Sequence, residues 1–448
     1  MPTHLILLAA GAGTRMLSDM PKVLHRIGGI PMFEHALNSA AALDGKRVLV
    51  VGSGADAVIQ AAYAIDPAIA IAHQTKQLGT AHAVVQATEA LRDASGDALI
   101  LYGDTPFIAP DTLVRMQDMR SMGADIVFLG FDAADPGRYG RMVTEGDRLV
   151  RIVEFKDAND QERAITLCNS GVVLAETETL LRLATAVGND NAAGEYYLTD
   201  IPALAAAEGL LTKVATCDEA ETLGVNSRAD LAQAEAVFQR NSRAAALSNG
   251  VTLEAPETVH FAADTQIGRD AVIEPYVVFG PGVTVESGAH IRAFSHLEGA
   301  HVGSRAVVGP YARLRPGAEL SNDTRIGNFV EIKNAEIGDG AKVNHLSYIG
   351  DASVGARTNI GAGTVTCNYD GVFKHRTEIG EDVFIGSDTM LVAPVRVGDE
   401  AMTATGSVIT TDVPAGDMAL ARARQVNKPG LARRLFSRLR AAKAAKKG

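Results

Sequence analysis

An aliphatic residue stands at every sixth position through most of the second half of the chain. The two longest registers are Ile267, Ile273, Phe279, Val285, Ile291, Leu297 and Val302, Val308, Leu314, Leu320, Ile326, Ile332. Neither an amphipathic helix nor an alternating strand has this period. A parallel β-helix built from hexapeptide repeats does, because each repeat turns one aliphatic side chain inward. A glycine often follows the aliphatic residue, which suits a tight corner.

The repeat lapses between about Thr366 and Glu378. We predict that residues Thr366 to His375 leave the coil as a loop, and loops on a rigid scaffold commonly carry function. His345 lies in the same part of the repeat. Its imidazole could accept a proton from an attacking amine, although a histidine beside a ladder position is also a common structural residue.

The first half of the chain alternates apolar runs with amphipathic stretches. This pattern predicts an α/β, Rossmann-like domain with a mostly parallel sheet, helices on both faces, and a ligand site at the carboxyl ends of the strands. The predicted strands are His4 to Ala10, Arg47 to Gly52, Ala98 to Gly103 and Asp125 to Phe131, and the predicted helices include Pro31 to Ala42 and Thr80 to Arg92.

An Ala-, Gln- and Arg-rich stretch at residues 227–248 separates the two halves and ends at Asn249-Gly250, a typical helix stop. We therefore expect a nucleotide-binding domain over 1–226, a linker helix over 227–248, and a β-helix over 249–448. The last 18 residues, from about 431, hold seven Lys or Arg and no acid. We interpret them as a disordered basic tail.

Composition and charge exclude several classes of protein. The net charge is −11, and without the seven cations of the tail the remaining residues carry −18, which argues against a nucleic-acid partner. Three unpaired cysteines support neither a disulfide framework nor a Cys-rich zinc site. No run has the length of a membrane span or the pattern of a signal peptide, so we expect a cytoplasmic protein without a membrane partner.

The first apolar strand leads into the string Leu8-Ala9-Ala10-Gly11-Ala12-Gly13-Thr14-Arg15-Met16. Small residues let backbone amides approach an anion, while Arg15 and Lys22 supply positive charge, so the loop suits a nucleoside triphosphate. A Walker loop would need Gly-Lys-Ser/Thr here, and a dinucleotide fingerprint would need a glycine where Met16 stands. The remaining alternative is an ordinary glycine turn between a strand and a helix.

Further motifs strengthen the nucleotide interpretation. They are Pro21-Lys22-Val23-Leu24, Gly79-Thr80-Ala81-His82-Ala83, Tyr102-Gly103-Asp104, Tyr139-Gly140-Arg141, Asn169-Ser170-Gly171, Gly194-Glu195-Tyr196-Tyr197-Leu198-Thr199-Asp200 and Gly224-Val225-Asn226. The chain resembles the sugar-phosphate nucleotidyltransferases and, over nearly its whole length, the bacterial bifunctional N-acetylglucosamine-1-phosphate uridyltransferase/glucosamine-1-phosphate N-acetyltransferases. This resemblance implies a left-handed β-helix, which the usual preference for right-handed crossovers would not predict.

The resemblance also implies roles for single residues. Arg15 and Lys22 would be the catalytic cations of uridylyl transfer, and Asp104 and Asn226 would bind Mg²⁺. UTP and UDP-N-acetylglucosamine would be bound by Leu8, Ala9, Ala10, Gly11, Lys22, Gln74, Gly79, Thr80, Tyr102, Gly103, Asp104, Gly140, Glu154, Asn169 and Asn226. Of these, Gly140, Glu154 and Asn169 would hold the N-acetylglucosamine phosphate.

In the solenoid the resemblance makes His345 the catalytic base and Glu331 the residue that orients it. Glucosamine 1-phosphate would contact Arg315, Lys333, Tyr348 and Asn359, and acetyl-CoA would contact Ala362, Asn368, Tyr369, Ser387, Thr405 and Arg422. Thr405 departs from the family, where alanine is familiar. A homotrimer is implied, with the acetyl-transfer site between solenoids.

Two rival interpretations remain from the sequence. In one, the chain is a single-function nucleotidyltransferase whose solenoid only regulates or assembles the enzyme. In the other, the solenoid is a trimerisation scaffold without chemistry of its own. His345, Lys333 and the Asn368-Tyr369 loop argue against both.

Overall fold

The structure of the protein is a computed structural model that describes residues 1–11, 13–52 and 54–446, so that Ala12 of the phosphate loop lies outside the described residues. The chain divides into two compact units. Unit 1 comprises Met1–Ala244 with Phe261–Ala263, and unit 2 comprises Ala245–His260 with Asp264–Gly448.

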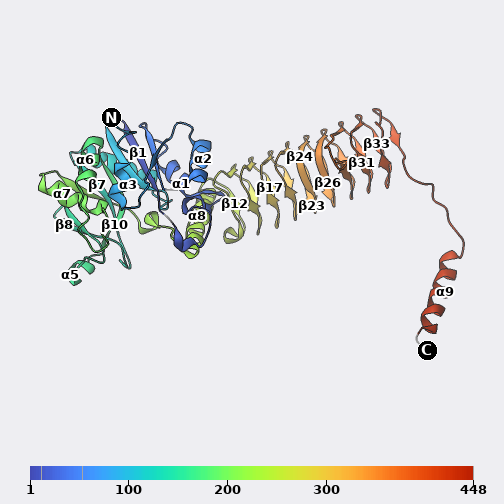
Figure 1. Cartoon of the computed structure of the whole chain (residues 1–448). Helices are drawn as coiled ribbons and strands as arrows, with labels where there is room; N and C mark the ends of the chain where they lie inside the picture. The colour runs from blue at the N-terminus through green and yellow to red at the C-terminus, as the bar shows by residue number, and fades with distance from the viewer. Residues whose placement is uncertain (12, 53, 447–448) are drawn as a thin grey trace. The chain divides into compact units, whose positions relative to one another are not determined.

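Unit 1 is built on a sheet with the strand order β11-β7-β10-β6-β1-β4-β5. Strands β1, β4, β5 and β6 are parallel to one another, whereas β10 is antiparallel to β6 and β7. The prediction of a mostly parallel sheet is confirmed (Figure 1). The strands are β1 (Thr3–Ala9), β4 (Arg47–Val51), β5 (Ala70–His73), β6 (Asp97–Tyr102), β7 (Ile126–Asp132), β8 (Arg141–Glu145), β9 (Arg148–Val153), β10 (Leu167–Glu176) and β11 (Thr212–Thr216), beside the short hairpin β2 (Arg26–Ile27) and β3 (Ile30–Pro31).

Helices cover both faces of this sheet. Alternate residues of β1 enter different cores: Leu5 and Leu7 pack with helices α1, α2 and α4, while Ile6 and Leu8 pack with α3, α6 and α7. The predicted strands agree with β1, β4, β6 and β7 to within one residue at each end. The helices are α1 (Met32–Ser39), α2 (Asp56–Ile65), α3 (Thr80–Val85), α4 (Pro110–Ser121), α5 (Asp160–Arg163), α6 (Thr177–Ala186), α7 (Ile201–Ala207) and α8 (Arg228–Ser248).

Two predicted helices, α1 and α3, are longer than the observed ones, and the linker helix agrees with its prediction to within one residue. Helix α1 ends at Ser39 rather than Ala42. Helix α3 ends at Val85 rather than Arg92, because the chain continues in turns such as Ala87 N–H to Val84 C=O. Helix α8 occupies the stretch where we expected a linker helix. The Asp230 carboxylate accepts hydrogen bonds from the amides of Asn226 and Ser227, both at 2.9 Å, which fixes the start of α8.

Unit 2 is a parallel β-helix whose short strands stack in three columns (Figure 1). Strands β24 and β26 are longer than the others and bend from the second column into the third, pairing with strands of both. The first column contains β12 (Thr252–Leu253), β14 (Val272–Ile273), β17 (His290–Ile291), β20 (Val307–Val308), β23 (Arg325–Asn328), β25 (Lys342–His345), β27 (Asn359–Ile360), β30 (Phe384–Ile385), β33 (Met402–Thr403) and β35 (Met418–Ala419).

The other two columns share β24 (Glu331–Ile337) and β26 (Tyr348–Val354). The second also contains β15 (Val278–Phe279), β18 (His296–Leu297), β21 (Arg313–Leu314), β28 (Val365–Cys367), β31 (Met390–Val392) and β34 (Val408–Ile409). The third also contains β13 (Gln266–Ile267), β16 (Thr284–Val285), β19 (Ala300–Val302), β22 (Ala318–Leu320), β29 (Thr377–Ile379) and β32 (Val395–Val397).

The aliphatic ladder predicted from the sequence forms the interior of this solenoid. From Ile273 to Ile409 its members are buried, and Ile267 at the first coil is half-buried. The predicted loop begins later than expected, at Asn368 instead of Thr366. Thr366 stays in β28 with its side chain fully buried, because its hydroxyl bonds to the backbone of Gly350 on the previous coil.

The tail also differs from its prediction. Instead of a disordered segment from about residue 431, the chain forms helix α9 (Leu431–Ala445), in which Ala, Leu and Arg are strong helix formers. None of its residues is buried. Within the described ranges, no helix combines the length and apolar character needed to cross a bilayer.

Candidate active sites

The first candidate site is a pocket of about 350 Å³ in unit 1, next to the carboxyl ends of β1 and β6. The amide of Gly103 donates to the carbonyl of Leu8 at 2.9 Å, which joins the ends of these two strands. The structure therefore brings together most of the residues predicted to bind the nucleotide. The predicted residues that line this pocket are Leu8, Ala9, Ala10, Gly11, Lys22, Gln74, Gly79, Thr80, Tyr102 and Asp104.

Asp104 and Asn226 converge on one point. Val225 donates its amide to the Asp104 carbonyl at 2.9 Å, so Asn226 is placed beside Asp104 although 122 positions separate them in the sequence. The Lys22 ammonium forms an ion pair with the Asp104 carboxylate and donates to Asn226 Oδ1 at 3.1 Å. The Lys22 side chain is itself buried, so the surrounding residues restrict its ammonium group to this position.

Arg15 is placed differently. It lies on the 3-10 helix η1 (Thr14–Met16), which follows the phosphate loop, and its side chain is exposed. It does not belong to the residues that line the pocket around Asp104. Of the two predicted catalytic cations, the structure thus brings Lys22 into the site and leaves Arg15 at the surface.

A second hollow of about 340 Å³ adjoins the first and shares Thr80, Tyr102 and Glu195 with it. It is lined by Gly140, Glu154 and Asn169, the three residues predicted to bind the sugar phosphate. Asn169 on β10 donates its amide to the Gly140 carbonyl at 2.9 Å. The predicted nucleotide and sugar residues therefore line neighbouring parts of one cleft.

Tyr102 and Glu154 stand where these two hollows meet. Burial, reinforced by the charges of Asp104 and Glu154, raises the pKa of Tyr102 far above its usual value, so the phenol stays protonated and can donate a hydrogen bond. Burial also raises the pKa of Glu154, and a hydrogen bond from the Thr199 hydroxyl at 3.2 Å opposes this shift.

Gly171 faces Tyr102 in a left-handed conformation, with φ +88°. A Cβ at this position would lie 2.7 Å from the ring of Tyr102. A side chain there would displace the ring from the cleft. Glycine is therefore needed at position 171 for two reasons: the backbone is left-handed there, and the Tyr102 ring leaves no room for a side chain.

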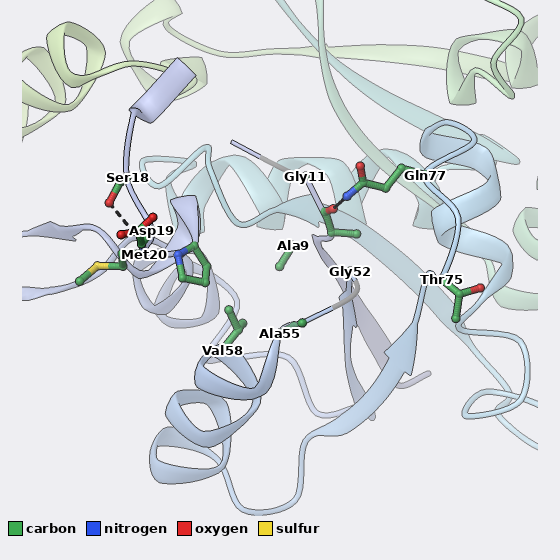
Figure 2. A pocket seen from close by; sticks show the side chains of 13 residues that line it. Ala9, Gly11, Ser18, Asp19, Met20, Gly52, Ala55, Val58, Thr75 and Gln77 are labelled. Carbon is green, nitrogen blue, oxygen red and sulfur yellow. Dashed lines mark hydrogen bonds between the residues drawn. The ribbon is translucent and has the colours of Figure 1, made fainter. Parts of the chain in front are cut away.

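Ala9, Ala10 and Gly11 also line a third pocket, of about 460 Å³. Ser18, Asp19 and Gly52 line other parts of this pocket (Figure 2). Gln77 lines both pockets and donates its side-chain amide to the carbonyl of Ala10 (Figure 2). This contact pins the phosphate loop, and the sequence analysis did not single out Gln77.

In unit 2 the candidate base and three of the six predicted acetyl-CoA residues fall into one column. Ile326, Val343, Ile360, Ile385 and Thr403 are register partners on successive coils of the first sheet. The residues two positions further along each coil therefore stack in the same order. They are Asn328, His345, Ala362, Ser387 and Thr405.

Backbone contacts hold this column in place. The amide of Asp388 donates to the carbonyl of Ala362 at 2.7 Å, and that of Gly406 donates to Ser387 at 2.8 Å. A Cβ on Gly361 or Gly386 would lie 2.5 Å from the backbone nitrogen of the residue one coil on, so glycine is needed for this spacing. Thr405 contributes its backbone nitrogen to this spacing, and that contact does not depend on its side chain.

The structure gives His345 a different hydrogen-bond partner from the predicted Glu331. Glu331 forms an ion pair with Arg315 at 2.8 Å, whereas Nδ1 of His345 lies 2.9 Å from Oδ1 of Asn328. The asparagine oxygen can only accept, so Nδ1 carries the proton and Nε2 is left as the acceptor. The His345 side chain is exposed and does not enter the packed ladder.

The residues predicted to bind glucosamine 1-phosphate do not all share one face. Arg315 and Lys333 follow the paired ladder residues Leu314 and Ile332, so they are neighbours on successive coils of the second column. Tyr348 begins β26 in that column, three residues after His345. Asn359, in contrast, lies on β27 of the first column.

Lys374 joins Lys333 at this position and was missed by the sequence analysis. It belongs to the loop that leaves the coil, and contact with the Lys333 ammonium lowers the pKa of Lys374. Lys333, Lys374 and Arg315 outnumber the neighbouring carboxylates of Glu331 and Asp351, so this corner has an excess of positive charge that suits a phosphate.

The loop residues 368–376 are held by an internal network. Asp370 accepts from the amides of Val372 and Phe373 and pairs with His375 at 2.7 Å. The hydrogen bond to His375, followed by those amides, lowers the pKa of Asp370 to about 2. The network folds the loop back on itself, so that His375 donates its amide to the Asn368 carbonyl at 2.8 Å.

The predicted acetyl-CoA residues of this loop are placed in two ways. Asn368 is buried and donates to the carboxylate of Asp351, whereas Tyr369 is exposed and donates its hydroxyl to the Gly371 carbonyl. Burial raises the pKa of Asp351, but hydrogen bonds from Asn334 and Asn368 outweigh this effect and lower it. Arg422 follows the last coil and is exposed. Its Cδ would lie 3.9 Å from a Cβ built on Gly406.

Sequence comparisons identify the family. Residues 5–221 match the MobA-like NTP transferase domain, and residues 264–299 match the six-repeat bacterial transferase hexapeptide. The chain is 63% identical over 446 residues to "Bifunctional protein GlmU" of Jannaschia sp. (strain CCS1), an alignment that covers 99% of this chain and 98% of the relative. The chain belongs to the GlmU family. The GlmU protein of Cereibacter sphaeroides (strain ATCC 17025) is 67% identical over 446 residues, with 99% of this chain and 98% of that protein covered.

Membership of the GlmU family agrees with both halves of the fold. The nucleotidyltransferase match lies within unit 1, and the hexapeptide match lies within unit 2. The chain covers nearly the full length of its GlmU relatives, so both units belong to the family's common architecture. The rival interpretations, in which the solenoid carries no chemistry, find no support in this family of bifunctional proteins.

Proposed function

We propose that the two units carry out two steps of UDP-N-acetylglucosamine synthesis. The solenoid acetylates glucosamine 1-phosphate with acetyl-CoA, and the cleft of unit 1 transfers UMP from UTP to N-acetylglucosamine 1-phosphate and releases pyrophosphate. The chain is thus a bifunctional transferase, as its GlmU relatives are named. The observation that supports this most strongly is the column in which His345 is aligned with Ala362, Ser387 and Thr405.

In the acetyl-transfer step, the amine of glucosamine 1-phosphate attacks the thioester carbonyl of acetyl-CoA. A C–N bond forms and the C–S bond breaks, and the departing CoA thiolate takes up the proton that His345 removes from the amine. Nε2 of His345 accepts the proton of the attacking amine, because Asn328 holds the other proton on Nδ1. Arg315, Lys333 and Lys374 supply positive charge for the sugar phosphate.

In the uridylyl-transfer step, a phosphate oxygen of N-acetylglucosamine 1-phosphate attacks the α-phosphorus of UTP. The new P–O bond replaces the bond to the leaving pyrophosphate. The nucleophile is already an anion, so positioning and charge neutralisation matter more than a general base. Lys22 provides a fixed cation, and Glu154 and Asn169 line the part of the cleft that adjoins the nucleotide residues.

Asp104 and Asn226 fit a magnesium ion. Their oxygens converge on a single cation, here the Lys22 ammonium, and both are hard donors of the kind Mg²⁺ prefers. Two protein oxygens leave most of the coordination of such an ion to substrate phosphates and water. Bound there, the ion would neutralise charge on the triphosphate.

We also propose that the protein is a cytoplasmic homotrimer with the acetyl-transfer site between solenoids. Four aromatic side chains, Tyr276, Phe294, Tyr311 and Phe329, stack on successive coils with ring centroids 5.0, 4.9 and 5.3 Å apart. All four are exposed, which is unusual for a row of large apolar groups and suits contact with a second copy. A neighbouring copy would also explain why Asn359 lies on a different face from Arg315.

One assay tests both activities. Purified protein receives glucosamine 1-phosphate, acetyl-CoA, UTP and Mg²⁺, and free thiol and pyrophosphate are followed separately. We expect thiol release to precede pyrophosphate release, and pyrophosphate release to need no acetyl-CoA when N-acetylglucosamine 1-phosphate is supplied. Pyrophosphate release without any thiol release would leave only a nucleotidyltransferase. Sedimentation of Tyr311→Asp, expected to be smaller than the wild-type trimer, tests the assembly.

A further inference from the structure

Helix α9 displays a surface that neither active site uses. Its apolar side chains are exposed: Leu435 by 51%, Phe436 by 60% and Leu439 by 64%. The helix begins after Gly430, which adopts a left-handed conformation with φ +70°, and it has no buried residue. Large apolar groups on a helix that packs against nothing in its own chain call for a covering partner.

The apolar residues of α9 are segregated from its arginines. At about 100° per residue, Leu431, Leu435, Leu439 and Phe436 fall within an arc of about 140°, which also contains Lys443 near its edge. The remaining arc is largely basic and contains Arg433, Arg434, Arg438 and Arg440. A narrow apolar face opposite an arginine-rich face distinguishes α9 from a solvated helix.

The charge of α9 is uncompensated. Residues 431–448 contain seven Lys or Arg and no acid, whereas the other residues carry a net charge of −18. Over the part of the chain that the structure describes, no ion pair involves an arginine or lysine of α9. The helix therefore combines apolar area with positive charge, the pair of features that an anionic lipid surface complements.

We propose that α9 is a peripheral anchor that lies in the headgroup region of a bilayer containing anionic phospholipids. Leu435, Phe436 and Leu439 enter the acyl boundary, and the arginines contact lipid phosphates. The helix has 15 residues, about 22 Å at 1.5 Å per residue, which is too short to span the bilayer but sufficient to lie along it. This revises our expectation that the protein has no membrane partner.

Two other polyanionic partners fit the surface less well. A nucleic acid would match the arginines but leave the leucines and Phe436 in water. The acidic remainder of a second copy would match the charge, but it would have to offer an apolar groove as well. Both become outcomes of the test.

The experiment is co-sedimentation of the full-length protein with vesicles of pure phosphatidylcholine or with about one third phosphatidylglycerol. We expect binding to the anionic vesicles, weakened by salt, and little binding to the neutral ones. The variant L435Q/L439Q removes apolar contacts and keeps every charge. The variant R433Q/R434Q/R438Q removes three of the arginine charges proposed to contact lipid phosphates. At about 1 kcal/mol per charge, the second should bind about 100-fold more weakly.

A matched control is A441Q, which changes the polar side of the same helix and should bind like wild type. Circular dichroism of each variant with vesicles separates loss of binding from loss of helix. Equal binding of L435Q/L439Q and wild type, or equal binding to neutral and anionic vesicles, would overturn the proposal. So would a shift in oligomeric state or in DNA binding for L435Q/L439Q with no change in vesicle binding. Acetyl and uridylyl transfer should be unaltered in every variant.

Discussion

Asn328 and His345 are direct partners on adjacent coils, and Oδ1 of Asn328 lies 2.9 Å from Nδ1 of His345. An asparagine in this position fixes the tautomer of the imidazole without adding a charge beside it. The imidazole therefore donates from Nδ1 to Asn328 and keeps Nε2 as its acceptor.

Asn328→Ala should lower kcat of acetyl transfer by about 10-fold to 100-fold, because the imidazole loses its orientation but remains present. Asn328→Asp should restore orientation. Its carboxylate favours the imidazolium, so the acid limb of the pH–rate profile should move to higher pH. A profile for Asn328→Asp that coincides with wild type would show that residue 328 does not act on His345.

His345→Ala should abolish most acetyl transfer, a loss of about 10²-fold to 10⁴-fold in kcat, as expected for removal of a general base. Uridylyl transfer should be unchanged, since His345 lies in unit 2 and the nucleotide cleft lies in unit 1. Thiol release and pyrophosphate release measured on one preparation check both statements. Loss of both in a folded variant would contradict two independent sites.

Asp104→Ala should remove the magnesium dependence of uridylyl transfer together with most of its rate, about 10³-fold, because the carboxylate that pairs with Lys22 beside Asn226 is lost. Pyrophosphate release across a Mg²⁺ titration is the measurement. Acetyl transfer serves as the internal control and should keep its wild-type rate. Wild-type pyrophosphate release would remove Asp104 from the site.

Glu154→Gln should stabilise the protein at pH 7 and weaken the sugar site. The pKa of Glu154 is raised by burial, so the native state holds this proton more tightly than the unfolded state, and stability falls as pH rises through the folded pKa. The variant avoids this loss. Its Tm should exceed that of wild type at pH 7, and the difference should shrink as the pH is lowered toward 4.

The same variant should raise KM for N-acetylglucosamine 1-phosphate with a smaller change in KM for UTP, because Glu154 lines only the second hollow. Thr199→Val is the matched control, since it removes the hydroxyl that bonds to Glu154 but keeps the carboxylate. A Tm for Glu154→Gln below that of wild type at pH 7 would show that the charged form is stabilised in the fold.

His375→Ala should raise KM for acetyl-CoA several-fold with little effect on kcat. His375 closes the loop by pairing with Asp370, while the loop presents Asn368 and Tyr369. Phe373→Ala, in the same loop but bonded to Asp370 only through its backbone, should be milder. Equal KM values for acetyl-CoA in wild type and His375→Ala would separate this loop from donor binding.

The parts of the structure that follow from local pattern were predictable. The aliphatic ladder fixes which side chains are inside, and its members from Ile273 to Ile409 are buried as expected. The strand that ends before Asp104 is apolar from Ala98 to Leu101, so its position at the cleft followed from the fold class. Lys22 lines the nucleotide pocket, whereas Arg15, which is closer to the glycine-rich loop in the sequence, does not.

The features that the sequence did not predict depend on contacts between coils, or on hydrogen bonds that satisfy polar side chains in the interior. Asn328 lies 17 residues before His345, a distance that carries meaning only when the length of each coil is known. Thr366 looked incompatible with the ladder, but its hydroxyl is satisfied by Gly350. Lys374 meets Lys333 only because the loop folds back. Helix α9 was not predicted because its high positive charge suggested a disordered tail.

The column from His345 through Ala362 and Ser387 to Thr405 also acts as a measure of length. Each coil advances the solenoid by about 4.8 Å, so His345 and Thr405 are separated by about 14 Å along its axis. If an elongated acetyl donor binds along this row, the distance between its two ends must match a whole number of coils. A protein with one coil more between His345 and Ser387 would keep its aliphatic interior intact and yet hold the thioester about 5 Å out of place.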